Sequence, residues 1–94
     1  MKTLPGNLTF QRRTPEFTHT KIPKGILGQH STADGVWGKI QVCEGSLIYR
    51  ILEPEVEEHE LDVSRVGIVA PQDVHQVEIT GLVKFHIEFY PEED

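Results

Sequence analysis

Residues 36–52, VWGKIQVCEGSLIYRIL, decide the fold class of this chain. Apolar side chains alternate with polar ones in both halves of the stretch, which is the period of a β-strand with one face in the core. Glu44-Gly45 separates the halves and is typical of a tight turn. We therefore predict a hairpin with strands over Val36–Cys43 and Ser46–Leu52. The expected core faces are Val36, Gly38, Ile40 and Val42 on the first strand and Leu47, Tyr49 and Ile51 on the second.

Short strands divided by turns account for the rest of the chain. The expected set is Val56–Val63 at an edge, Val66–Ala70 buried on both faces, His75–Ile79, a long final strand Leu82–Tyr90, a short edge strand Leu8–Arg12 and an extended piece Gly25–Gln29. No segment of about ten residues has the period of 3.6 that marks a helix. We predict one all-β domain over residues 1–94, a sandwich or small barrel, with residues 1–20 as an N-terminal arm or edge strand.

The composition argues against several classes of protein. A formal net charge of −6 speaks against a nucleic-acid partner, which needs clustered Lys and Arg. No apolar run approaches the roughly 20 residues of a membrane span, and the N-terminus lacks a hydrophobic signal segment. The single cysteine, Cys43, cannot form an intramolecular disulfide, which fits a reducing, cytoplasmic setting. Small β domains commonly dimerise to cover apolar surface.

Two histidines stand where a turn meets a strand. In the stretch Pro71–Ile79, His75 shares a strand face with Val77 and Ile79, so it must hydrogen-bond a core neighbour, bind a metal or line a pocket. His30 follows another short segment and precedes a polar turn. In a barrel such junctions gather at the open end, where ligands bind. A transition metal needs three or four N, O or S ligands, and for both histidines a structural role is equally open.

His86 and Glu88 share one face of the last predicted strand. They are candidates to complete a site with His75. The same strand carries Phe85, Ile87 and Phe89 on its other face. If only that face is buried, His86 and Glu88 point to solvent, which the alternation slightly favours; if the strand is covered on both faces, they lie inside.

The remaining polar and aromatic candidates are weaker. Trp37 and Tyr49 lie on the predicted hairpin, where packing is the more common role and an aromatic wall for a ligand is the alternative. Cys43 has no base near it in sequence, so we expect a packed or partly exposed thiol that is not a nucleophile. The chain has no phosphate-binding glycine loop and no zinc-type cysteine pair, and no catalytic residue is predicted.

A series of short motifs resembles the TehB/YeaR-like cupin family, the small cupin domains associated with tellurite resistance. The matching positions are Thr14-Pro15-Glu16-Phe17, Pro23, Leu27, His30-Ser31-Thr32, Gly35-Val36-Trp37-Gly38, Val42, Gly45, Leu47, Pro71, His75, Phe85 and Phe89. The resemblance implies a double-stranded β-helix, that is, a cupin-like jelly-roll barrel, often dimeric, with a metal site inside.

The cupin metal motif is only partly present. Thr32, Asp34 and Gly38 occupy the positions of two of the usual histidines and the glutamate, and only His30 lies nearby. His75 matches the histidine of the second motif. The metal set that the resemblance supports is therefore His30 and His75, with Glu88 or His86, holding zinc or another transition metal.

Three functions follow from these expectations. The favoured one is a cytoplasmic homodimer, related to tellurite or oxidative-stress resistance, that binds a metal ion, an oxyanion or a small molecule in the barrel mouth without catalysing a reaction. The alternative is a metal-dependent dioxygenase or isomerase that uses His30, His75 and a carboxylate. The third is a structural module that dimerises through its first segment and last strand. We do not expect the chain to bind S-adenosylmethionine, since it lacks a methyltransferase domain.

Overall fold

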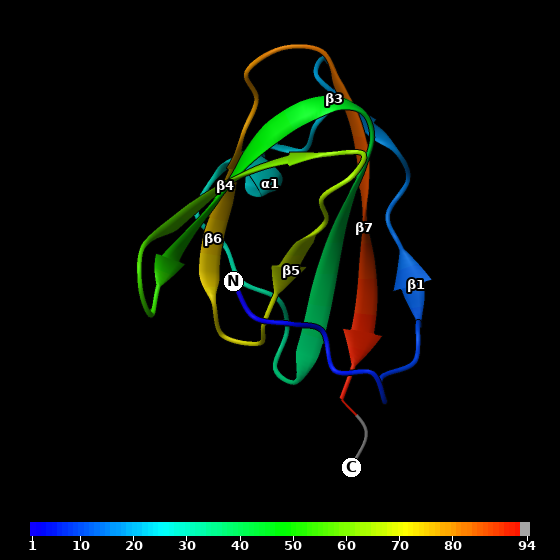
Figure 1. Ribbon diagram of the computed structural model, residues 1–94, viewed down its shortest axis with the longest axis vertical. Coiled ribbons are helices and arrows are strands. Elements are labelled where there is room, and N and C mark those ends of the chain that lie inside the picture. Colours follow the sequence, from blue (N-terminus) through cyan, green and yellow to red (C-terminus); the bar gives the residue numbers. More distant parts are fainter. Residues whose placement is uncertain (93–94) are drawn as a thin grey trace.

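One long strand, β3 (Val36–Glu53), organises the computed structural model, which describes residues 1–92. The first half of β3 pairs antiparallel with β5 (Gly67–Val69) on one side and β7 (Val83–Pro91) on the other. Its second half pairs with β4 (Glu57–Asp62) and β6 (Val74–Glu78). Figure 1 shows β3 rising beside β7, bending over, and descending beside β4 and β6. The two halves of β3 therefore belong to two layers, with the core between them.

The hairpin predicted at Glu44-Gly45 is wrong, because β3 continues through this pair without turning back. The predicted core faces are right. Buried side chains occupy the even positions up to Val42 and the odd positions from Leu47, a change of parity that the hairpin was meant to explain. A β-bulge produces it instead: the pairing of β3 with β7 shifts between Val42 and Glu44, which inserts Cys43 as an extra residue.

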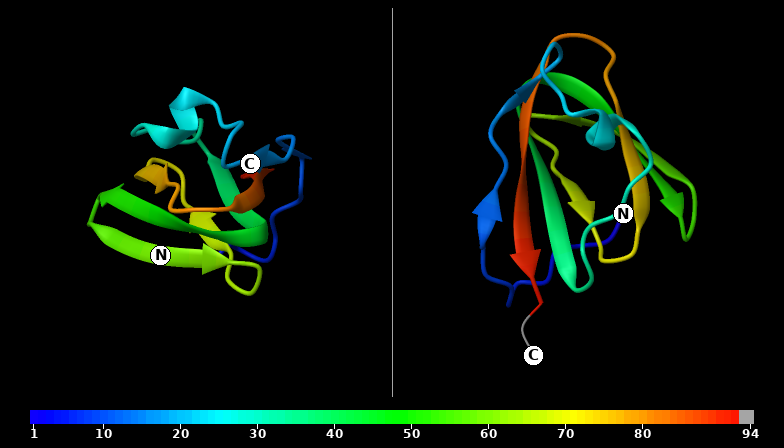
Figure 2. Two further views of the ribbon diagram at one scale, coloured as in Figure 1. Left: turned by 90° about the horizontal axis from the view of Figure 1, so that it is seen from above. Right: turned by 180° about the vertical axis from the view of Figure 1, so that it is seen from behind.

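The other predicted strands exist with slightly different bounds. β4, β5, β6 and β7 fall within or beside the expected ranges. The edge strand expected at Leu8–Arg12 is wrong for residues 8–11, and only Arg12 belongs to a strand, β1 (Arg12–Arg13). A second short strand, β2 (Phe17–Thr18), follows, and both pair with the free edge of β7. The extended piece expected at Gly25–Gln29 is wrong: Lys24–Leu27 forms α1, a single helical turn, which packs beside β6 (Figure 2).

The strands of residues 1–92 form a seven-stranded antiparallel sheet that is not closed. The all-β prediction is confirmed, and the closed jelly-roll barrel is not. The core lies on the inner faces of both halves of β3 and of the strands beside them; its members are Ile40, Val42, Leu47, Tyr49, Ile51, Leu61, Val69, Val77, Val83, Phe85 and Ile87. No helix formed by residues 1–92 has the length and apolar character needed to cross a membrane.

Candidate functional site

His30 and His75 lie opposite each other in an isolated antiparallel bridge. The backbone N–H of His30 donates to the carbonyl of His75 at 2.9 Å, and the N–H of His75 donates to the carbonyl of His30 at 2.8 Å. Residues paired in this way place their side chains on the same face. The two imidazole rings are accordingly adjacent, with centroids 4.0 Å apart and planes inclined by 58°. The structure thus brings together the two histidines that the sequence singled out.

Both rings are held by a backbone carbonyl two residues earlier. Nδ1 of His30 lies 2.8 Å from the carbonyl oxygen of Gly28, and Nδ1 of His75 lies 3.3 Å from that of Asp73. A carbonyl oxygen only accepts a hydrogen bond, so each Nδ1 carries the hydrogen. In a neutral imidazole the other nitrogen then presents a lone pair. Both Nε2 atoms are therefore available as acceptors or metal ligands when the rings are neutral.

His75 is neutral at physiological pH. Its side chain is only 3% exposed, as predicted for a histidine on the apolar face of its strand. Burial, first, and the neighbouring His30 ring lower the pKa of His75 to about 4. The cause is that an imidazolium would lose its hydration in this position. A neutral ring is the form that binds metal ions.

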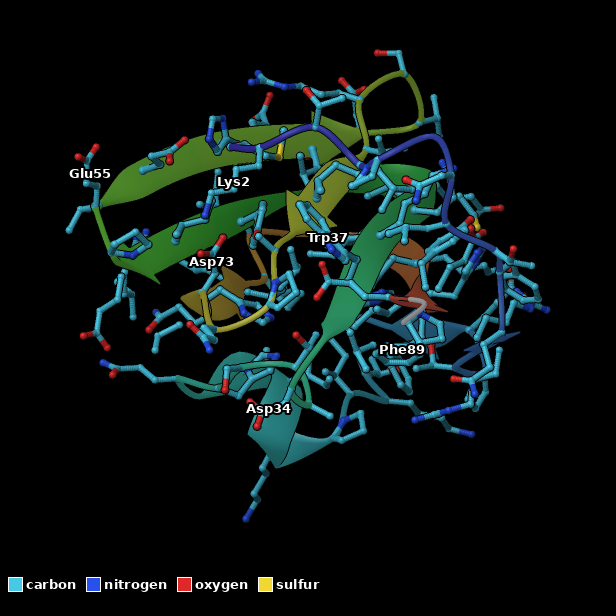
Figure 3. The ribbon with its side chains drawn as sticks, turned by 90° about the horizontal axis from the view of Figure 1, so that it is seen from below. Lys2, Asp34, Trp37, Glu55, Asp73 and Phe89 are labelled. Carbon is cyan, nitrogen blue, oxygen red and sulfur yellow. The ribbon has the colours of Figure 1, made fainter. Side chains whose placement is uncertain are left out.

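Asp73 and Tyr49 border the pair. Asp73 is buried, and Lys2 Nζ lies 3.4 Å from its carboxylate; Figure 3 shows the two side chains side by side. The ring of Tyr49 meets that of His75 edge to face, with centroids 5.9 Å apart. The Tyr49 hydroxyl donates to the carbonyl of Ile68 at 2.9 Å. Burial, first, and the carboxylate of Asp73 raise the pKa of this hydroxyl, so it stays protonated. Tyr49 therefore supports the His75 ring from within the core.

His86 and Glu88 lie elsewhere, on β7. The expectation that His86 points into solvent is wrong, because it is 8% exposed. Three consecutive residues of β7, Phe85, His86 and Ile87, are buried, so the strand is covered on both faces at this point. His86 Nε2 lies 2.9 Å from Glu88 Oε2, and the Tyr90 hydroxyl donates to Glu88 Oε1 at 2.7 Å. Within residues 1–92, neither side chain forms a group of three metal-ligand atoms with His30 and His75.

Sequence reasoning missed the partners that His86 does have. Its Nδ1 lies 3.8 Å from Cys43 Sγ, and the carboxylate of Glu16 completes a group whose ligand atoms all lie within 4.8 Å of one another. Burial and the neighbouring Glu16 raise the pKa of the Cys43 thiol. The three residues are far apart in the chain, and only the strand register brings them together. No spacing in the sequence carries this signal.

Trp37 and the surface grooves stand apart from the histidine pair. Trp37 pairs with Tyr90 in the sheet, and its indole nitrogen is buried without a hydrogen-bond partner in the part of the chain described. An open groove of about 490 Å³ runs beside β6, lined by residues that include Leu27, Gln76 and Ile79. Its lining does not include His30 or His75. This groove is therefore separate from the His30–His75 pair.

Comparisons with known proteins place the chain among related domains. A family model described as the TehB-like domain matches residues 12–87. A crystal structure of a protein from Escherichia coli K12 superposes with a TM-score of 0.87 over 100% of both chains at 21% identity. TehB from Haemophilus influenzae superposes with a TM-score of 0.82 at 27% identity, over 93% of this chain and 32% of its own. The chain thus spans about a third of that TehB. A search of curated proteins finds no match.

Proposed function

Because the chain belongs to the TehB-like domain family, we propose that it is a small binding domain that holds a divalent transition-metal ion at the His30–His75 pair and catalyses no reaction of its own. One observation carries the proposal: the two rings are adjacent, and each directs its Nδ1 hydrogen to a backbone carbonyl. Carbonyl partners of this kind fix the tautomer of metal-binding histidines in known sites. Imidazole nitrogen suits zinc, copper, iron and nickel.

The same hydrogen bonds favour a cation over an oxyanion. An oxyanion needs hydrogen-bond donors or positive charge, whereas a neutral ring whose Nδ1 is engaged offers only a lone pair. His75 is neutral at pH 7, because burial lowers its pKa. Lys2, which lies beside this region, is already paired with Asp73. Of the three ligands expected from the sequence, the metal ion is thus the best match to the charges around the pair.

Two histidines leave part of the coordination shell open. Among residues 1–92 no third Asp, Glu, Cys or His offers a ligand atom close to both rings. Water or a small molecule would fill the remaining positions of a bound ion. Glu88, the carboxylate that the alternative enzyme would need, is engaged with His86 and Tyr90. A binding role therefore fits the geometry better than a dioxygenase or isomerase.

The cellular setting belongs to the same proposal. The motif resemblance associates such domains with the cupin fold and with tellurite or oxidative-stress resistance, and we extend both to this chain. The matching TehB is about three times as long, since this chain covers 32% of it, so the activity of that whole protein is not transferred. A cytoplasmic location and a homodimer remain predictions. Cell fractionation would test the location, and light scattering would test the oligomeric state.

Metal titration of histidine variants tests the proposal. Zinc and nickel binding would be measured by calorimetry in a Cys43→Ser background, which removes the other ligand group. We expect one ion per chain, with affinity at least about tenfold weaker in His30→Ala and in His75→Asn. His19→Ala is the matched control, because His19 is an exposed histidine on another segment. Undetectable binding, or equal binding by all variants, would refute the metal site.

A further inference from the structure

A second group of ligand atoms is built by three neighbouring strands on the outer face of β7. Phe17 pairs with Phe85 in the core, so Glu16 and His86, one step along each strand, face outward together. On the other side of β7, Gln41 pairs with His86, and the bulge after Val42 inserts Cys43. A bulge re-aims a side chain and is common beside functional sites. Here it sets the thiol beside the imidazole.

The hydrogen bond between His86 and Glu88 sets the tautomer of the His86 ring. Nε2 lies 2.9 Å from a Glu88 carboxylate oxygen, which accepts, so Nε2 carries the hydrogen. When the ring is neutral, Nδ1 then holds the lone pair, and it faces Cys43 Sγ at 3.8 Å. Glu88 is itself fixed by the Tyr90 hydroxyl at 2.7 Å and by Lys39 Nζ at 4.0 Å. A carboxylate behind the histidine is the usual second layer of a zinc site.

We propose that Glu16, Cys43 and His86 form a binding site for a thiophilic divalent cation such as Zn²⁺, independent of the His30–His75 pair. Zinc bonds of about 2.3 Å to sulfur and 2.0 Å to nitrogen place tetrahedral ligands about 3.5 Å apart, close to the 3.8 Å between Cys43 Sγ and His86 Nδ1. Glu16 is exposed and can move its carboxylate into position. Three protein ligands leave a fourth position open to water.

The charges also suit a divalent ion. Binding releases the thiol proton to the solvent, so that one thiolate and one carboxylate balance the two positive charges of the ion. Glu88 does not add free negative charge, since Lys39 and Tyr90 engage it. A role for Cys43 as a nucleophile fits less well. Burial and Glu16 raise the pKa of its thiol, whereas a reactive cysteine needs a lowered pKa. A bound cation would displace the proton of the Cys43 thiol and bind the thiolate.

Cobalt substitution tests the site, because a Co²⁺–thiolate bond gives a charge-transfer absorption that histidine and carboxylate ligands do not. Co²⁺ would be titrated into reduced protein carrying His75→Asn, which disables the other site. We expect the absorption to saturate at one equivalent and to disappear in Cys43→Ser. Glu88→Gln should weaken the affinity for Co²⁺ about 10- to 100-fold through the orientation of His86. Competition with Zn²⁺ would then give the affinity for the native candidate.

Two controls separate ligation from general damage. Glu44→Gln changes an exposed carboxylate next to Cys43 on β3, and it should leave the absorption and affinity unchanged, whereas Glu16→Gln should weaken binding. Thermal unfolding of each variant checks that it folds. The proposal is overturned if the unmutated cluster gives no thiolate absorption, or if the absorption persists unchanged in a folded His86→Asn variant. Neither result bears on the His30–His75 pair, which contains no sulfur.

Discussion

A Cβ atom placed on Gly45 would lie 1.9 Å from the carbonyl oxygen of Leu82. The backbone of Gly45 also has φ at +73°, a conformation that other L-residues rarely adopt. Gly45 directly follows the bulge and pairs with Val83 at the start of β7. The contact lies where β3 passes from its pairing with β7 to its pairing with β4.

Replacement of Gly45 by alanine should therefore destabilise the protein strongly. We expect the free energy of unfolding to fall by about 3 kcal/mol or more, from left-handed strain and from the clash with backbone atoms. Urea denaturation measures it. Gly81→Ala is the matched control, because a Cβ there meets nothing within 4 Å, and its effect should stay within about 0.5 kcal/mol. Equal effects of the two substitutions would contradict the requirement for glycine at position 45.

Removal of the Tyr49 hydroxyl should cost stability out of proportion to its size. The hydroxyl is buried and donates to the carbonyl of Ile68 at 2.9 Å, so Tyr49→Phe leaves that carbonyl without its partner, at a cost of about 1–3 kcal/mol. Tyr90→Phe removes a hydroxyl from a half-buried side chain, and Glu88 keeps its other partners; we expect a loss below about 1 kcal/mol. If thermal denaturation ranks the two variants in the opposite order, the hydrogen bond of Tyr49 is not important.

Acid should destabilise the protein through His75 well before most carboxylates titrate. The pKa of His75 is lowered to about 4 in the folded state, against about 6.5 in the unfolded chain. The unfolded state therefore binds more protons between these values, and stability is complete above pH 6.5 and falls as the pH drops toward 4. The loss from this group approaches about 3 kcal/mol.

Urea unfolding between pH 4 and 7 measures this dependence, with His75→Asn for comparison. The variant should show a flatter profile above pH 5, whatever its absolute stability. Carboxylates with lowered pKa values, such as Glu88, lose their contribution only at lower pH and are common to both proteins. A variant profile parallel to that of the parent would show that His75 is not the titrating group.

Phe17 should both stabilise the core and position Glu16, one of the three ligands of the proposed Glu16–Cys43–His86 site. Its ring packs edge to face on Phe85, with centroids 5.6 Å apart. Phe17→Ala should lower the free energy of unfolding by about 2 kcal/mol. It should also weaken cobalt binding, because β2 then no longer positions Glu16. Phe10→Ala is the control: Phe10 is 49% exposed, and its loss should change neither quantity noticeably. Tight cobalt binding by a destabilised Phe17→Ala protein would argue against Glu16 as a ligand.

The sequence determined the faces of the strands better than their connections. Alternation around Ile40 and Tyr49 identified the core side of each half of β3 correctly, because burial follows side-chain direction. The change of parity at Glu44-Gly45 has two physical causes, a turn or a bulge, and both use glycine at positive φ. Only the pairing partners distinguish them, and these are distant in the chain. The single turn α1 was missed because four residues are too few to show a helical period.

For the candidate site, too, the sequence predicted which way a side chain points but not which residues it meets. His75 was predicted on the inner face from its place between apolar residues, and its burial follows. Its pairing with His30 depends on a bridge across 45 residues (75 minus 30), which no local pattern encodes. The cluster of Glu16, Cys43 and His86 depends on the register of three strands and on the bulge. Chemistry that arises from register becomes visible only in the folded chain.

The course of β3 through both layers also bears on how the protein is made. The first half of β3 finds its principal partner in β7, which begins 30 residues after β3 ends (83 minus 53). During synthesis, the layer that the second half of β3 forms with β4 and β6 can assemble before β7 is available to pair with the first half of the same strand. An exposed strand edge of this kind is a template for pairing with other chains. The nascent protein is therefore most vulnerable to self-association just before β7 leaves the ribosome, and slower translation of that interval would prolong the exposure.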